Sequence, residues 1–447
     1  MYTSVIGKTF LDAYNDKNRT HYDPRSFFEE VFVPLFFDHP KYMMTAGNSP
    51  LENPKLSWDD MIQGKKDFET PEKRQDRIKK IINKIENEPA DASIAVGYPV
   101  TDNTAPTSCQ VTSAGIKISK DEVYLSWIGA ALGIGVQGGI TILFDNKSLL
   151  LDIAEGWKHY RQLLNRYPFM KGNQINTWNG KWIAHRYDSF VYEERNPIAS
   201  LNVFQNNTDE LFSINTISWV PVLMGISLTH DLDNIAGYLY NIGQTNTTYG
   251  FIPFCLNQIK STRRFYKRLF GDNLLDIQKS ERLYGTAMGL KVACSKGAIG
   301  IAAMEPKGLR DYMKSGKKIS FDMDNEDQKI TFNTYINWII AMMNNDKIWD
   351  SAKEIAQQLL LFEQGAGKAK KNRENLVKQL MDSGSSKIFL QNLIPIIEEI
   401  GHEASFENES LKRHFGEIGK EIHLLPKDNF PYFNTLIKFQ YALISNN

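Results

Sequence analysis

Apolar residues recur at helical spacing in several stretches of the first half of the chain. Asp23 and Pro24, a helix N-cap followed by a first-turn proline, precede one such stretch. Thr70 and Pro71 repeat this signature before a run in which isoleucines form a narrow stripe among many charges. A third stretch, residues 149–165, has the same period. We expect three helices, the first buried and the second on a surface.

Short β-branched runs between turn-forming residues predict strands further along. The runs between residues 93 and 144 predict a β-sheet in that part of the chain. Asn179 and Gly180, the preferred residues of a two-residue type I′ turn, lie between two tryptophan-containing runs and predict a β-hairpin. Beyond it we expect helices around 231–242 and 251–270, separated by short apolar pieces. The runs assigned to the sheet are residues 93–100, 115–119, 122–129 and 138–145.

From about residue 331 nearly every segment has helical period, and the separators are short and rich in turn residues, as in an antiparallel bundle. We therefore expect an α+β fold, with an irregular mixed α/β N-terminal body and a C-terminal all-helical bundle. The expected domains are a mostly helical segment 1–92, a mixed sheet-and-helix body 93–325 with a basic patch, and the bundle 326–447. The helical segments are residues 331–344, 348–364, 372–382, 387–401, 410–425 and 433–444.

Composition narrows the class of protein. A length of 447 residues predicts two or three domains. Lys plus Arg and Asp plus Glu number 52 each, so no global field draws the chain to nucleic acid or an anionic membrane, and any such binding needs a local patch. The 3 cysteines form no CxxC pair. We expect a cytoplasmic protein without a membrane span, because the longest uncharged run is rich in glycine and no secretory signal opens the chain.

A glycine-rich segment matches a dinucleotide-binding motif by letter. Gly133, Gly135 and Gly138 fit GxGxxG, but a strand-like run follows where that motif requires a helix. We expect a glycine-rich strand connection, or a place where another backbone approaches closely, and no cofactor. The sequence has no GxxxxGK[ST] phosphate loop and no GxSxG nucleophile elbow, so we assign no catalytic residue.

Two groups of residues leave metal chemistry open. His230 and Asp231 form an HD pair of the kind that metal-dependent phosphohydrolases use, with His159 and His185 as possible further ligands. Asp231 also suits the N-cap of the helix expected after it, and we favour that interpretation. Asp327, Gln328 and Lys329 follow Asp322 and Asp324 in the manner of a restriction-type nuclease, although their spacing is typical of a solvated turn. We assign no metal ligand.

Local charge is more informative than total charge. Residues 251–310 contain 11 basic and 4 acidic residues, a net charge of +7. The densest part combines cations at helical offsets with two aromatic rings, a mixture that binds phosphates and stacks on bases. A second basic cluster lies between two helices of the expected bundle. The candidate nucleic-acid-binding residues are Lys260, Arg263, Arg264, Phe265, Tyr266, Lys267, Arg268, Lys296, Lys368, Lys370 and Lys371.

The order of these parts is similar to that in a known family. The segments LLLFEQGAGKAKKNRENLVKQL and EIGKEIHLLPKDNFPYFNTLIKFQYAL, preceded by the basic helix, resemble the large subunit of type I CRISPR Cascade surveillance complexes over about the last 200 residues. The resemblance implies a non-catalytic subunit that contacts target DNA, helps to hold the displaced strand along its bundle and docks a separate helicase-nuclease. It assigns no motif-reading residue by position.

The sequence thus supports three hypotheses. The first is a nucleic-acid-binding, non-catalytic subunit of a prokaryotic antiviral complex, whose partners are DNA or guide RNA and other protein subunits. The second is a stand-alone metal-dependent nuclease or phosphohydrolase of a defence system. The third is a protein-interaction scaffold that does not bind nucleic acid.

Overall fold

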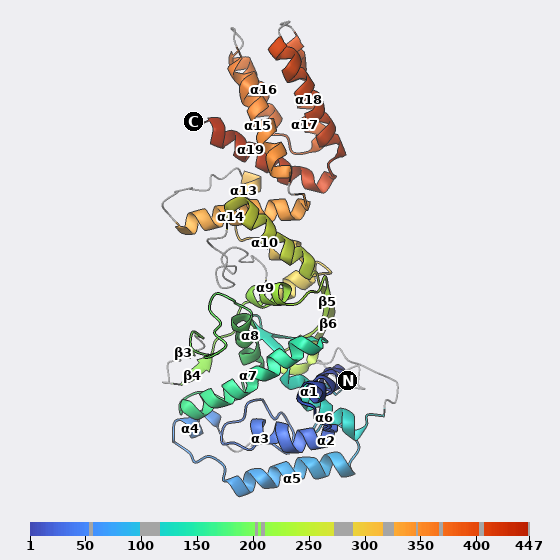
Figure 1. Cartoon of the computed structure of the whole chain (residues 1–447), viewed down its shortest axis with the longest axis vertical. Helices are drawn as coiled ribbons and strands as arrows, with labels where there is room; N and C mark the ends of the chain where they lie inside the picture. The colour runs from blue at the N-terminus through green and yellow to red at the C-terminus, as the bar shows by residue number, and fades with distance from the viewer. Residues whose placement is uncertain are drawn as a thin grey trace. The chain divides into compact units, whose positions relative to one another are not determined.

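The structure is a computed structural model whose fold is α+β, as the sequence predicts (Figure 1). It forms two compact units, of which the first comprises residues 1–260 and 289–304 and the second residues 261–271 and 305–445. The expected domain boundaries at residues 92 and 325 stay predictions. The described residues are 1–52, 57–98, 117–201, 204–206, 211–271, 289–315, 326–345, 347–365, 370–401 and 406–445.

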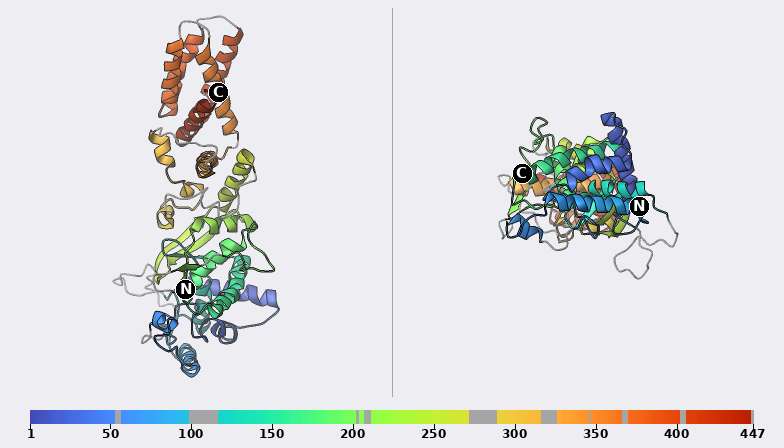
Figure 2. Two further views of the ribbon diagram at one scale, coloured as in Figure 1. Left: turned by 90° about the vertical axis from the view of Figure 1, so that its left-hand side faces the viewer. Right: turned by 90° about the horizontal axis from the view of Figure 1, so that it is seen from below.

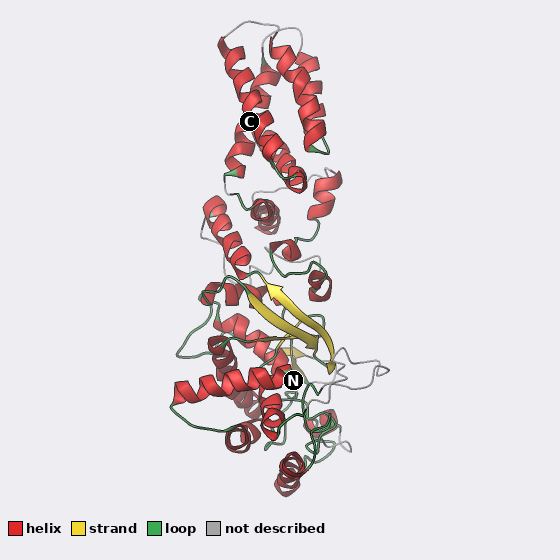
Figure 3. Ribbon diagram, turned by 90° about the vertical axis from the view of Figure 1, so that its right-hand side faces the viewer, coloured by secondary structure: helices red, strands yellow, loops and turns green. Residues whose placement is uncertain are grey.

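In the first unit, helices surround a four-stranded antiparallel sheet in the order β1-β2-β5-β6, drawn in yellow in Figure 3. A second sheet pairs β3 with β4. The strands are β1 (Ile134–Val136), β2 (Ile140–Phe144), β3 (Phe204–Asn206), β4 (Phe212–Ile214), β5 (Ile235–Asn241) and β6 (Gln244–Phe254). The helices are α1 (Tyr2–Asn18), α2 (Pro24–Phe27), the π-helical turn η1 (Phe28–Phe32), α3 (Val33–Phe36), α4 (Trp58–Ile62), α5 (Pro71–Asn87), α6 (Lys120–Ala131), α7 (Lys147–Arg166), α8 (Ile175–Arg186), α9 (Trp219–Thr229), α12 (Leu290–Cys294) and the 3₁₀ turn η2 (Ile301–Met304).

Local signals located several of these helices correctly. The Asp23 carboxylate accepts the backbone N–H of Ser26 at 2.8 Å, which caps α2. Thr70 caps α5 in the same manner. The isoleucine stripe of α5 faces inward, most of its charged side chains other than Arg74 face solvent, and the helix lies along the outside of the unit (Figures 1 and 2). The predicted helix at 149–165 is confirmed as α7.

The core of the first unit brings α1 against α6 at very short range. A Cβ atom on Gly129 would overlap the carbonyl oxygen of Thr3, and one on Gly7 would overlap that of Leu125. Glycine at both positions therefore lets the two backbones touch. Rings fill the space beside them, with Trp157 of α7 in edge contact with Phe36 at 4.9 Å between centroids.

The predicted sheet at 93–144 is only partly correct. Residues 138–145 do contain strand β2, but 122–129 are helical and belong to α6, which opens with a capping box between Ser119 and Glu122. Every residue from Val123 to Ala131 is buried, so α6 has no polar face to reveal its period. Residues 93–98 form turns, and residues 99–116 lie outside the described part of the chain.

The hairpin predicted at Asn179 and Gly180 is wrong, because both residues lie inside helix α8. Tertiary contacts explain this choice. The Asn179 side-chain amide donates to the carbonyls of Ala131 and Gly133 at 2.8 and 2.9 Å. A Cβ on Gly180 would overlap the carbonyl oxygen of Gly135, so this glycine serves close packing of α8 on β1 rather than a turn.

The helix predicted at 231–242 is also wrong. Its second half is strand β5, which pairs with both β2 and β6. Asp231 therefore caps no helix, and its carboxylate instead accepts Lys260 Nζ at 3.1 Å. The helix predicted at 251–270 is correct only after Cys255. Strand β6 ends at Phe254, and helix α10 (Leu256–Phe270) begins after the cysteine.

The second unit is helical, and the segments of helical period predicted from residue 331 onward are confirmed. Rings and aliphatic side chains from the facing helices fill its core, as where Phe389 meets Phe430 at 5.7 Å between centroids. Among the described residues of the whole chain, no helix is long and apolar enough to cross a membrane. Besides the end of α10 its helices are α13 (Leu309–Ser315), α14 (Glu326–Met343), α15 (Ile348–Gln364), α16 (Lys370–Met381), α17 (Ser386–Gly401), α18 (Phe406–Leu424), the 3₁₀ turn η3 (Lys427–Asn429) and α19 (Phe430–Ser445).

Candidate nucleic-acid interface

Helix α10 has one buried face and one cationic face. Ile259, Thr262 and Tyr266 are fully buried, and at 100° per residue they lie on one side of the helix. Four cations lie on the other side, where Arg264, Lys267 and Arg268 are exposed and Lys260 is half-buried. Arg263 is also half-buried and lies at the border of the buried face, next to Ile259. The helical offsets predicted from sequence therefore form a single positive strip.

Contacts with α14 fix the orientation of this strip in the second unit. The Asn337 side-chain amide donates to the backbone carbonyl of Thr262 at 3.1 Å. Asn333 donates to the Tyr266 hydroxyl at 3.3 Å, and burial raises the pKa of that phenol. Because these polar contacts are buried, the helix cannot rotate about its axis without breaking them. The cations are therefore held toward solvent.

The cations also interact with their neighbours. Arg268 pairs with Asp350 at 3.0 Å, and both side chains are about half exposed. The Arg264 guanidinium carbon lies 5.6 Å from the centroid of the Phe265 ring. Exposed ion pairs of this kind contribute about 0–1 kcal/mol, so a phosphate can replace the carboxylate at little cost. Guanidinium groups suit such an exchange because one guanidinium can form two parallel hydrogen bonds to two oxygens of a phosphate.

The two aromatic residues of the predicted site belong to the core. Phe265 is 4% exposed and Tyr266 is 0% exposed. Stacking on a base requires an open ring face. The expectation that these rings stack on bases is therefore corrected, and the candidate interface retains only the cations of α10.

The remaining predicted cations are not part of this strip. Lys296 is exposed and follows α12 in the first unit. Lys370 and Lys371 are exposed in the first turn of α16, where the helix dipole adds to their positive potential. Lys368 lies outside the described residues.

The structure assembles no metal centre from the HD pair. His230 contacts Tyr187 and Ser148, whereas His159 Nδ1 lies 3.2 Å from Gln162 Oε1. His185 Nε2 lies 3.0 Å from the carbonyl oxygen of Pro197. Over the part of the chain that the structure describes, no group of three or more His, Cys, Asp or Glu side chains could hold a metal ion.

The residues with nuclease-like spacing near residue 327 do not form the strand that a restriction-type site requires. Asp327, Gln328 and Lys329 lie in the first turn of helix α14, where the restriction-type arrangement requires a strand. Asp322 and Asp324 lie outside the described residues.

The GxGxxG match is confirmed as a strand connection. Gly135 lies in β1, and Gly138 and Gly139 turn the chain into β2 with φ of 92° and 71°. These φ values are left-handed, which favours glycine. A Cβ on Gly135 would lie 2.9 Å from the backbone of Asn176 in α8. The motif thus serves a hairpin turn and close packing.

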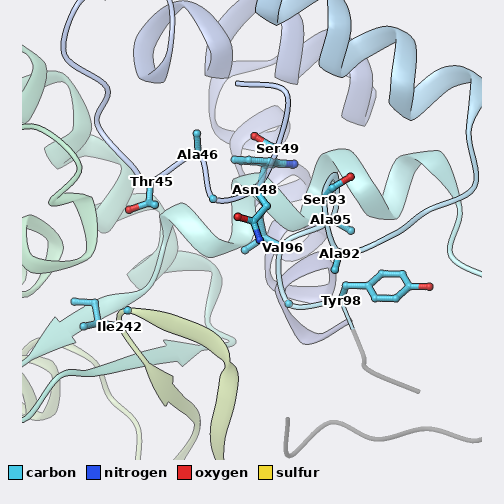
Figure 4. A pocket seen from close by; sticks show the side chains of 14 residues that line it. Thr45, Ala46, Asn48, Ser49, Ala92, Ser93, Ala95, Val96, Tyr98 and Ile242 are labelled. Carbon is cyan, nitrogen blue, oxygen red and sulfur yellow. The ribbon is translucent and has the colours of Figure 1, made fainter. Parts of the chain in front are cut away.

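The first unit also contains a cavity of about 410 Å³ that no sequence motif predicted (Figure 4). The turns 45–49 and 92–98 form most of its wall, with Trp127 and the β5–β6 turn completing it. Its described lining offers hydroxyl, amide and backbone groups and carries no charged side chain. Its volume is within the range of small-ligand pockets. In the sequence, only the small residues of segments 45–49 and 92–97 could have indicated this cavity, and such residues are equally typical of turns.

Comparison with known proteins found no matching family model, no similar curated protein and no similar solved structure. The cationic strip of α10 is the sequence-predicted site whose residues the structure brings together.

Proposed function

We propose that the chain binds nucleic acid through the cationic strip of α10. The observation that carries this proposal is the separation of faces on the helix, with Ile259, Thr262 and Tyr266 buried and Arg264, Lys267 and Arg268 exposed. Such a strip can contact a phosphate backbone, and contacts of this kind supply most of the affinity in sequence-independent binding. The net charge of the chain is zero, so attraction is local to this region.

We further propose that the protein acts as a non-catalytic subunit of a prokaryotic antiviral complex similar to CRISPR Cascade. The order of a mixed body, a basic helix and a helical bundle supports this assignment. Its partners would be target DNA or guide RNA and other protein subunits, and its compartment the cytoplasm. It would need no cofactor. No described group of side chains favours the alternative of a metal-dependent nuclease or phosphohydrolase.

The test is the salt dependence of binding after neutralising two exposed cations. The double variant Arg264→Gln with Lys267→Gln should weaken binding of the full-length chain to a labelled DNA duplex at low salt. Two lost phosphate contacts should reduce the slope of log affinity against log salt by about 1.8 on duplex DNA, or about 1.4 on a single strand. Fluorescence anisotropy over a salt series measures both quantities.

A matched control is available on α18. Lys412→Gln with Arg413→Gln removes the same charge from an exposed helix surface and should leave the slope unchanged. Equal slopes for the wild type and the α10 variant would refute the proposed interface. The same measurement belongs in the assembled complex, because partner subunits can complete a groove around the strip.

A further inference from the structure

Four side chains form a continuous hydrogen-bonded series at the start of α7. Ser148 Oγ lies 3.2 Å from His230 Nδ1, and His230 Nε2 lies 2.7 Å from the Tyr187 hydroxyl oxygen. The Tyr187 hydroxyl donates to Asp152 Oδ2 at 2.7 Å. All four residues belong to the first unit. The series thus joins an exposed hydroxyl to a carboxylate through an imidazole and a phenol.

Three helices supply these residues. Ser148 and Asp152 lie one turn apart at the start of α7, while Tyr187 and His230 directly follow α8 and α9. The two rings meet edge to face with centroids 5.3 Å apart. Ser148 is exposed, whereas Tyr187 is 8% exposed. The serine hydroxyl is therefore open to a reactant, whereas the Tyr187 phenol is not.

The Asp152 end of the series determines which nitrogen of His230 carries the proton. A carboxylate is the strongest acceptor in the series, so the Tyr187 proton lies toward Asp152. Burial and the nearby Asp152 raise the pKa of the phenol, which therefore stays protonated. The Tyr187 oxygen then accepts Nε2–H, leaving the lone pair of Nδ1 toward Ser148. Burial lowers the pKa of His230, which favours this neutral form.

Asn146 holds the serine in place beside the imidazole. Its side-chain oxygen accepts the N–H of Leu149 at 3.0 Å, which caps α7, and also lies 2.8 Å from Ser148 Oγ. The serine hydroxyl therefore has two acceptors, and rotation about its Cβ–Oγ bond directs the proton to one or the other. The Leu149 N–H is thus bonded already, but the first N–H groups of a helix have no carbonyl acceptor within it, and such groups can stabilise a developing oxyanion.

We propose that Ser148 is a nucleophile toward carboxylic esters, with His230 as its general base and Tyr187 and Asp152 as positioning residues. Oγ forms a bond to the ester carbonyl carbon while its proton moves to His230 Nδ1. The bond to the alcohol breaks, and His230 returns the proton to the departing oxygen. Water then cleaves the acyl–serine bond by the same route, which releases the acid and restores Ser148. This activity does not depend on nucleic-acid binding by α10, and if it is found, the word non-catalytic in the proposed function no longer applies to the first unit.

Covalent labelling of the full-length chain tests the nucleophile. With an alkyl fluorophosphonate, Oγ forms a bond to phosphorus, fluoride leaves, and the serine proton passes through His230 to solvent. Mass spectrometry of the digested protein should locate the label at Ser148. Ser119 is an internal control, because it is also exposed at the start of a helix but its hydroxyl pairs with Glu122 instead of a histidine.

Variants separate chemistry from folding, with circular dichroism as the check on structure. Ser148→Ala should abolish the label, and His230→Gln should slow labelling by about 100-fold or more while keeping hydrogen-bonding capacity. Tyr187→Phe should lower kcat for p-nitrophenyl acetate and leave KM unchanged. Equal labelling of Ser148 and Ser119, absence of any labelled serine, or ester hydrolysis that survives Ser148→Ala would overturn the proposal.

Discussion

Lys41 is a buried cation whose partners are backbone carbonyls. It is 6% exposed, and its ammonium group donates to the carbonyls of Tyr167, Pro168 and Met170 at 2.8, 3.2 and 3.3 Å. Burial and the nearby Arg161 lower its pKa to about 8. The lysine thus connects the loop after α7 to the segment after α3. Keeping its ammonium group charged in this buried site costs free energy, and that cost depends on pH.

This cost predicts a specific change of stability with pH. Between about pH 8 and pH 10.5 the unfolded chain holds the Lys41 proton and the folded chain does not. The free energy of unfolding from this group therefore rises with pH over that range. Lys41→Met should remove this rise, as measured by urea denaturation from pH 8 to pH 10.

Comparison with a surface lysine isolates the effect. Lys8 is 68% exposed in its side chain, so Lys8→Met should keep the wild-type slope of stability against pH. If Lys41→Met also keeps that slope, the lysine is not charged at a cost in the folded state.

At the scale of elements, helices with a polar face were predictable and fully buried helices were not. α5 and α10 each show a stripe and a charged side, and both were identified from the sequence. α6 and α9 are buried on all sides along most of their length. Their sequences therefore lack the contrast on which periodicity depends.

The contact between α1 and α6 provides a prediction at this scale. Gly129→Ala should destabilise the protein by about 1–3 kcal/mol or more, because the new methyl group overlaps the Thr3 carbonyl oxygen and forces the helices apart. Chemical denaturation measures the change.

An exposed helical glycine is the control with the opposite sign. Gly416 lies in α18 with nothing within 4 Å of an added Cβ. Gly416→Ala should stabilise the chain by about 0.5–1 kcal/mol, since alanine favours the helix. Similar effects of the two substitutions would contradict the close approach of α1 and α6.

At the scale of the whole molecule, each compact unit has its own core. Trp178 and Trp182 are 0% exposed in the first unit, and Leu359 and Phe389 are 0% exposed in the second. The cores therefore draw on different residues, and opening of one can be followed separately from opening of the other.

Hydrogen exchange should show this separation. Leu359→Ala, a cavity-forming change that costs about 2–5 kcal/mol, should speed amide exchange in α15, α17 and α19. Exchange in α7 and α8 should stay at wild-type rates. Acceleration of α7 and α8 to the same degree would indicate one cooperative core in place of two.

The sequence by itself determined the bundle helices, the starts of α2 and α5, the presence of α7, and the cationic strip of α10. These features depend on neighbours within a few residues, because caps, stripes and turn separators act locally. For α10, the local pattern located the cations, but only burial against the rest of the fold showed that Phe265 and Tyr266 are core residues.

The tertiary structure alone decided the features that join distant segments. Asn179 and Gly180 form helix instead of a turn because the Asn179 amide bonds the carbonyls of Ala131 and Gly133, and Gly180 packs closely on the backbone of β1. Ser148 and His230 are 82 residues apart, and packing of α7, α8 and α9 brings them within 3.2 Å. Local propensity contributes little per residue, so when a segment is wholly buried, its long-range contacts choose the conformation.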